Sequence, residues 1–167
     1  MLTSITIPDS VTKISDHAFS GCTSLKSIAI PAGVTEIDHN AFSGCTSLES
    51  VAIPESVTEI GSFAFSDCTS LTSITIPAGV KSIWWGVFSG CTSLESVAIP
   101  ESVTEIGYGA FSGCTGLTSI NIPTSVADIG NKAFDGCTSL IIRGKSGSFA
   151  EQYAKENNIH NIPFEAI

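Results

Sequence analysis

Apolar residues recur in fixed columns along this chain, each member 23 positions after the one before it. Several columns keep a single residue type in all six units, among them Leu2, Leu25, Leu48, Leu71, Leu94 and Leu117; Ile7, Ile30, Ile53, Ile76, Ile99 and Ile122; Phe19, Phe42, Phe65, Phe88, Phe111 and Phe134; the valines from Val11 and the isoleucines from Ile14 do the same. A constant period of about 20–50 residues is typical of solenoids, in which one supersecondary unit stacks on the next. We therefore predict six coils over residues 2–139, each burying its apolar side chains only against its neighbours.

Each unit begins with a segment that has the pattern of a strand. From Leu25 to Ile30 apolar and small polar residues alternate, and β-branched types are frequent, which indicates a short, half-buried strand. Pro31 ends it, since proline lacks the amide donor that a central strand needs. The stretch Val34–Cys45 has unevenly spaced apolar residues with glycine or serine between them. It predicts a second extended segment and a tight turn, and hence a β-rich solenoid with a parallel sheet on one face.

The repeat ends at residue 139, and the last 28 residues, 140–167, have a different pattern. They begin with one further strand-like run and continue with the best helix signal of the chain. Ser148 and Glu151 have the spacing of a capping box, while Phe149 and Tyr153 share one helix face. We predict that residues 140–167 form a C-terminal cap made of a strand and a helix.

The first unit has no comparable cap before it. Its apolar face is left without an upstream coil to cover it: Ile5, Ile7, Val11, Ile14 and Phe19. Solenoids generally need polar capping units at both ends to remain dispersed. We therefore interpret the chain as a fragment of a longer array or an engineered array, and we expect self-association through this first coil.

The consensus L-x-x-I-x-I-P-x-x-V-x-x-I-x-x-x-A-F-x-x-C resembles the BspA-type leucine-rich repeats found in surface proteins of bacteria and some parasitic protists. The resemblance covers residues 2–139 as six copies, and the tail is similar to that family's terminal segment. It implies an extracellular or cell-surface location and a non-enzymatic adhesion module that binds a protein or a glycan, such as a host matrix component. The alternative is a passive scaffold, engineered or truncated, with no ligand of its own. No signal peptide is visible in the chain, and no run of 18 apolar residues could span a membrane.

Charge narrows the range of partners. The formal net charge is −9, and residues 1–139 carry four basic and thirteen acidic side chains. A surface of this sign repels phosphate backbones and anionic lipids, which argues against nucleic-acid binding and against electrostatic membrane docking. Neutral or basic proteins and glycans remain as partners.

One cysteine occupies the same place in every unit: Cys22, Cys45, Cys68, Cys91, Cys114 and Cys137. Uniform spacing produces a row instead of the tetrahedron that zinc requires. Neighbouring thiols one strand spacing apart could in principle bridge, but six equivalent cysteines have no reason to pair in one register. We predict a row of reduced, buried thiols, in preference to disulfides or a metal site, and we expect no cofactor.

Catalytic motifs were sought and lack the context that each requires. Gly144–Ser146 imitates the end of a phosphate-binding loop, but Ser139 stands where the first glycine belongs. Ser10–Lys13 fits the S-x-x-K motif without a K-T-G after it. We expect no enzyme. Four turn residues could approach one another as a weak metal site, although we interpret them, like His160 in the tail, as solvated surface groups: Asp16, His17, Asp38 and His39.

Trp84-Trp85 is the feature most indicative of binding, because other units mostly carry glycine or small polar residues there. Phe63 in the preceding unit and Tyr108 in the following one fall within one residue of the same columns. A cluster of four aromatic residues on a polar turn surface has the composition of an interface hot spot or a sugar-stacking platform. Packing into a small satellite core is the alternative, since tryptophans often fill gaps left by glycine.

The outward positions of the predicted strands are bland by comparison, being mostly serine, alanine and threonine. Such a surface offers shape and little anchoring energy, because hot spots are normally aromatic or arginine. Acidic residues recur in every second unit: Glu49 and Glu95, Glu55 and Glu101, Glu59 and Glu105. We interpret this recurrence as the trace of a duplicated two-repeat unit and not as a recognition feature.

Overall fold

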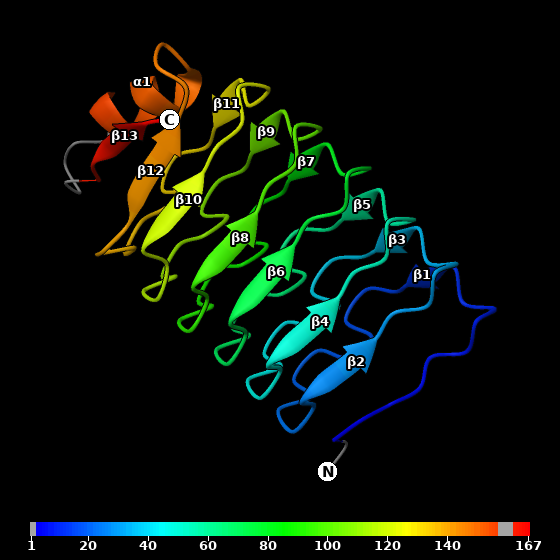
Figure 1. Ribbon diagram of the computed structural model, residues 1–167. Coiled ribbons are helices and arrows are strands. Elements are labelled where there is room, and N and C mark those ends of the chain that lie inside the picture. The colour runs from blue at the N-terminus through cyan, green and yellow to red at the C-terminus, as the bar shows by residue number, and fades with distance from the viewer. Residues whose placement is uncertain (1–2, 157–161) are drawn as a thin grey trace.

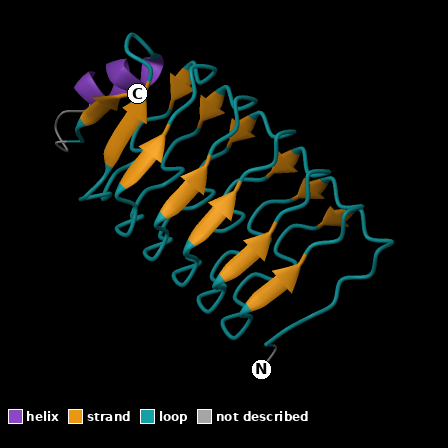
Figure 2. Ribbon diagram, in the orientation of Figure 1, coloured by secondary structure: helices purple, strands orange, loops and turns teal. Residues whose placement is uncertain are grey.

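The computed structural model describes residues 3–156 and 162–167, and these form a stack of similar coils (Figure 1). Leu2 and His160 lie outside the described residues. From the second coil to the sixth, each coil contributes one strand to the front row of arrows in Figure 1 and a shorter strand to a second row behind it, to which the first coil adds β1 (Lys13–Ile14). A single helix lies at the C-terminal end of the stack (Figure 2). The prediction of a β-rich solenoid built from 23-residue coils is confirmed.

The first extended segment of each unit forms the front sheet. Its strands are β2 (Ser27–Ala29), β4 (Ser50–Ala52), β6 (Ser73–Thr75), β8 (Ser96–Ala98), β10 (Ser119–Asn121), β12 (Ile141–Gly144) and β13 (Phe164–Ala166). The paired strands run parallel; residues 23 apart are partners in the repeats, as in Ser27 with Ser50, and the offset is 22 where β12 pairs with β10 and β13. The middle residue of β2, β4, β6, β8 and β10 points inward: Ile28 is buried, whereas Ser27 and Ala29 are exposed. Residues with small side chains therefore cover the outer surface of this sheet.

The second extended segment forms a sheet of its own on the opposite side of the coils. Its strands are β1 (Lys13–Ile14), β3 (Glu36–Ile37), β5 (Glu59–Ile60), β7 (Ser82–Ile83), β9 (Glu105–Ile106) and β11 (Asp128–Ile129). Parallel pairing with a 23-residue offset joins β1, β3 and β5, and likewise β7, β9 and β11. In each strand the isoleucine is buried and the residue before it faces outward. The solenoid therefore has a parallel sheet on two faces, not on one.

A continuous core fills the space between the two sheets, and the phenylalanine column forms its axis. Successive rings are stacked with centroids 5.2–5.9 Å apart and interplanar angles of 3–18°. Phe42 and Phe65 are fully buried, as are Leu48 and Leu71 beside them. Full burial of such a side chain contributes about 1.5–3 kcal/mol relative to leaving it exposed. Stacking of equivalent residues is therefore the principal source of stability of the array.

The cap begins where the period ends. β12 continues the front sheet in register with β10, and β13 adds a further parallel strand beyond it. The helix α1 (Phe149–Glu156) lays Tyr153 edge-on against Phe134, with centroids 5.9 Å apart. The helix thereby covers the last ring of the phenylalanine column, so the predicted strand and helix are confirmed. β13 was not predicted.

The predicted capping box is wrong in one of its two halves. The Ser148 hydroxyl is buried and has no hydrogen-bond partner. Glu151 accepts a hydrogen bond from the backbone N–H of Gly147, one residue earlier than the box requires, and pairs with Lys155 at 2.8 Å. These contacts lower the pKa of Glu151, the Lys155 hydrogen bond being the larger cause. The acidic side chain therefore supports the helix start without the serine.

Candidate functional site: an aromatic patch on the turns

The turn after each second-sheet strand contains one residue in the left-handed backbone region, and these residues form a column. Its members have φ between 53 and 61°: His17, Asn40, Phe63, Gly86, Gly109 and Lys132. A positive φ is a genuine outlier for a bulky residue such as Phe63. Glycine in the next coil leaves room for the Phe63 side chain, because a Cβ on Gly86 would lie 2.2 Å from the Phe63 ring. The ring is thus laid against the backbone of the fourth coil.

The tryptophan pair follows β7 in the fourth coil and is positioned by its backbone. The Phe63 N–H donates to the Trp85 carbonyl at 2.9 Å, and the Gly86 N–H donates to the Tyr108 carbonyl at 3.0 Å. A Cβ on Gly107 would lie 2.9 Å from Cδ1 of Trp85 and 2.9 Å from the carbonyl carbon of Trp84. The indole of Trp85 therefore lies across a position in the fifth coil that only glycine can occupy.

All four aromatic residues are accessible on the molecular surface. The exposed fractions are 41% for Phe63, 36% for Trp84, 59% for Trp85 and 51% for Tyr108. The glycines beneath and between them, such as Gly86 and Gly107, are buried. The alternative of a closed satellite core is not what the structure shows. We call these four residues the aromatic patch.

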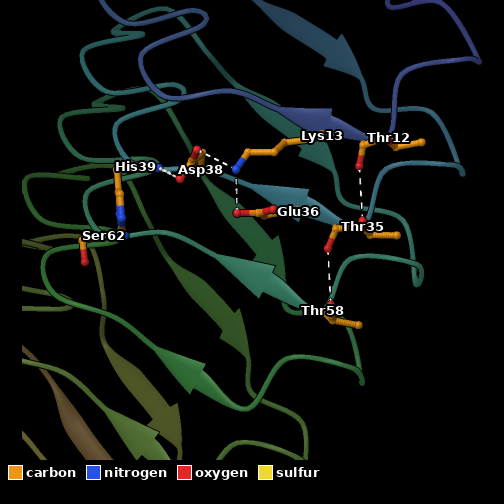
Figure 3. Close-up of polar contacts among 8 residues, drawn as sticks. All are labelled: Thr12, Lys13, Thr35, Glu36, Asp38, His39, Thr58 and Ser62. Carbon is orange, nitrogen blue, oxygen red and sulfur yellow. Dashed lines mark hydrogen bonds and ion pairs between the residues drawn. The ribbon is translucent and has the colours of Figure 1, made fainter.

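The turn residues proposed as a weak metal site are occupied by other contacts (Figure 3). Lys13 Nζ lies 2.9 Å from an Oδ of Asp38, and the Asp38 carboxylate also accepts the N–H of His39. The Lys13 hydrogen bond, followed by that of the His39 N–H, lowers the pKa of Asp38. His39 Nδ1 accepts the N–H of Ser62 at 2.9 Å. Among the described residues, no group of three metal-ligating side chains converges.

The cysteines are all free thiols in the structure, and five of them are buried. Each buried thiol donates to the carbonyl of a phenylalanine in the preceding coil at 3.1–3.2 Å, as Cys68 does to Phe42. Burial raises the pKa of Cys45 and of Cys137 to about 11, and raises those of the three central thiols further. Cys22, in the first coil, is half-buried. In the structure the six thiols form the predicted row, which is buried in every coil except the first.

The motifs with a superficial catalytic resemblance do not gather partners. Lys145 and Ser146 line an open hollow of about 470 Å³ beside the start of α1. The amide at that helix start is already bonded to the Glu151 carboxylate, which repels an anion. In the S-x-x-K sequence, Lys13 is held by Glu36 and Asp38.

The two remaining surfaces are an open apolar end and the smooth front sheet. Ile5 is 37% exposed, and the outer side of the first coil encloses a hollow of about 240 Å³ that Val11 and Phe19 help to line. On the front sheet, a shallow depression of about 570 Å³ is lined by residues such as Ser73 and Ala98. It contains no aromatic or charged side chain among its lining residues.

Sequence reasoning proposed the aromatic patch but overlooked the acidic residues near it. Glu59 and Glu105 face outward from β5 and β9, the strands on either side of β7, which leads into Trp84. Their recurrence in alternate units was attributed to duplication. Their columns, two positions before the Trp84 column, were the available signal.

Parallel two-sheet coils with a 23-residue repeat and a leucine column define a leucine-rich-repeat solenoid. The family model of the BspA type leucine rich repeat region matches in six copies, over residues 1–115 and 60–157. The chain therefore belongs to the BspA-type leucine-rich repeat family. A search of curated proteins gave no match.

Three crystal structures of bacterial proteins are similar to this chain. A leucine-rich cell surface protein from Faecalibacterium prausnitzii A2-165 is 46% identical over 86% of this chain and 39% of its own, with a TM-score of 0.80. A leucine-rich repeat protein of T. pallidum is 30% identical over 98% of this chain and 85% of its own, with a TM-score of 0.82. A leucine-rich repeat protein from Eubacterium ventriosum ATCC 27560 is 32% identical over 81% and 43%, with a TM-score of 0.61. This chain thus spans less than half of the first and third proteins.

The fold is that of leucine-rich-repeat surface proteins. Within the ranges that the structure describes, no helix has the length and apolar character needed to cross a membrane.

Proposed function

We propose that this chain is a non-enzymatic binding module of a bacterial cell-surface protein, and that the aromatic patch is the surface that contacts its protein or glycan partner. The observation that carries the proposal is the exposure of Trp84 and Trp85, at 36% and 59%, on turns fixed by backbone hydrogen bonds between coils. Large aromatic side chains held rigidly at a surface have the character of interface hot spots. Similarity to a cell surface protein supports the location.

The patch is better suited to binding than the front sheet. Serine and alanine on the front sheet supply little anchoring energy, whereas an exposed tryptophan can bury a large area on contact. Holding the rings on stacked glycines also reduces the conformational entropy lost when a partner binds. The aromatic patch therefore combines area with preorganisation.

The test is a binding screen against immobilised matrix proteins and glycan arrays, with the double variant Trp84→Ala/Trp85→Ala. We expect the variant to lose at least about tenfold in affinity for any partner that the parent chain captures. Ile167→Ala is the matched control, because Ile167 is an exposed apolar residue outside the patch, at 71% exposure. Circular dichroism and the melting temperature establish that both variants are folded. Equal binding by the parent and the tryptophan variant would refute the proposal; a parent that captures nothing would favour the passive scaffold.

A further inference from the structure

Two carboxylates lie on either side of Ser82 on the outer surface of the second sheet, two residues before Trp84. Pairing of β7 with β9 places Ser82 beside Glu105, and β5 presents Glu59 from the other side. Alternate residues of an extended segment point to the same side, so Ser82 and Trp84 share this surface. Glu59 and Glu105, two coils apart, are separated by roughly 10 Å along the stack. Ser82 therefore lies between the two acidic residues, and Trp84 follows it two residues later on the same surface.

In the first two coils the equivalent columns are close enough for their side chains to touch. The Lys13 ammonium lies 2.9 Å from the carboxylates of both Glu36 and Asp38 (Figure 3). Glu59 follows Lys13 by 46 residues, or two repeats, and Trp84 follows Asp38 by the same 46. Glu59 and Trp84 thus stand in the relation in which Lys13 and Asp38 touch. The repeat geometry brings the Glu59 carboxylate within reach of the Trp84 indole.

The later coils lack the cation that the first coil has. Across the described residues, Glu59 and Glu105 take part in no ion pair. Lys81, the nearest lysine along the chain, is exposed and belongs to the column of Thr58 and its equivalents instead. Lys132 stands one coil beyond Tyr108 and would repel a cation at that end of the patch. The end of the patch that attracts a cation is therefore the one nearer Glu59.

We propose that the aromatic patch binds a positively charged side chain, arginine in preference to lysine, from an exposed segment of a protein partner. A cation over an indole face is attracted by the ring quadrupole, and a guanidinium can at the same time donate to a carboxylate such as Glu59. Arginine fits better because its planar group stacks on aromatic rings. The net charge of −9 draws a basic segment toward this surface. This inference rests on the proposed function and specifies its partner.

Intrinsic fluorescence reports on the patch alone, because Trp84 and Trp85 are the two tryptophans of the chain. The probes are acetylated, amidated tetraarginine and its citrulline counterpart, which has nearly the same shape and no charge. We expect tetraarginine to change the tryptophan emission, with an affinity at least about fivefold higher than that of the citrulline peptide at roughly 50 mM salt. The difference should shrink in about 1 M salt, where charges are screened. Equal affinities for the two peptides would overturn the inference.

Variants separate local recognition from attraction to the whole acidic chain. Glu59→Gln/Glu105→Gln should weaken tetraarginine binding by about fivefold or more. Glu49→Gln/Glu95→Gln is the control: it changes the net charge equally, at two exposed sites with the same two-coil spacing beside the front sheet. Equal losses in the two double variants would reduce the effect to bulk charge and refute the inference.

The two proposals fail in different ways. If a neutral glycan binds through Trp84 and the tetraarginine peptide does not, the cationic partner is refuted and the proposed function stands. If Trp84→Ala/Trp85→Ala leaves every captured partner bound, the proposed function itself fails. Retention of a partner by Glu59→Gln/Glu105→Gln, but not by the tryptophan variant, likewise counts against the cation and supports the patch.

Discussion

Raising the pH under reducing conditions should destabilise this protein through its row of buried thiols. In the unfolded chain a cysteine titrates near its ordinary pKa of 9.0, whereas burial raises the pKa of Cys45 to about 11 and raises that of Cys91 further. The folded state therefore holds these protons at a pH at which the unfolded state releases them. Their contribution to stability is complete below pH 9 and is lost as the pH rises toward 11 and beyond.

The size of the effect follows from the burial of five of the six thiols, each at most 5% exposed. At about pH 9.5, ionisation favours the unfolded state by roughly 0.8 kcal/mol for each thiol that ionises only on unfolding. Five equivalent thiols together amount to about 4 kcal/mol. A domain of this size typically has a stability of about 5–15 kcal/mol. A large share of the folding free energy should thus disappear between pH 7 and pH 9.5.

Urea unfolding followed by circular dichroism, at about pH 7, 8.5 and 9.5 with a phosphine reductant, measures this loss. Cys91→Ala should lower the stability at pH 7, because it leaves a small cavity, yet reduce the pH-dependent loss by about 0.8 kcal/mol. Cys22→Ala is the matched control at the half-buried end of the row and should change the pH dependence less. The reasoning is refuted if the free energy of unfolding changes by less than about 1 kcal/mol over this range, or if the two variants behave alike.

Three further outcomes are expected. In the native protein a disulfide reagent should modify Cys22 rapidly and the five buried thiols only after urea is added; several fast thiols would contradict the burial. Gly107→Ala should cost about 1–3 kcal/mol and shift the tryptophan emission, because its Cβ would lie 2.9 Å from the Trp84 carbonyl carbon; an unchanged melt and spectrum would argue against that packing. Asp38, whose pKa is lowered, stabilises the folded state at pH values above the ordinary aspartate pKa of 3.8. This contribution is lost as the pH falls through the pKa of Asp38 in the folded state. Asp38→Asn should therefore flatten the acid limb of the stability curve by up to about 1 kcal/mol, and an unaltered limb would exclude the pair with Lys13.

The sequence determines the inward columns more completely than the ends of the array. A phenylalanine that returns every 23 residues can be buried in every unit only by stacking, and the rings do stack. β13 (Phe164–Ala166) escapes such reasoning, because it pairs with β12 once and outside any period. The sequence motif also failed to predict the environment of the Ser148 hydroxyl, which is buried without a hydrogen-bond partner instead of capping the helix.

The candidate site was predictable in its position and not in its geometry. Column alignment alone places Trp85 next to Tyr108 on a turn. That the indole lies across Gly107 depends on a missing Cβ in the following coil. The left-handed backbone at Phe63 was overlooked, although asparagine and glycine, which adopt this region readily, occupy the same column in other coils. Such features arise between coils and are visible only once the coils are stacked.

Stacking also separates the residues that fold this protein from those that can bind. Inward columns are constrained by both neighbours, so they hardly vary; outward columns touch little, so they are free to differ. The fourth coil departs from the repeat on its outer side, where Ser82, Trp84 and Trp85 occupy outward or turn positions. Its Phe88 nevertheless stacks on Phe111 like the other phenylalanines of the column. Because each coil contacts only adjacent coils, such departures add surface chemistry without disturbing distant packing. The array therefore provides a uniform frame on which one coil presents a distinct aromatic surface.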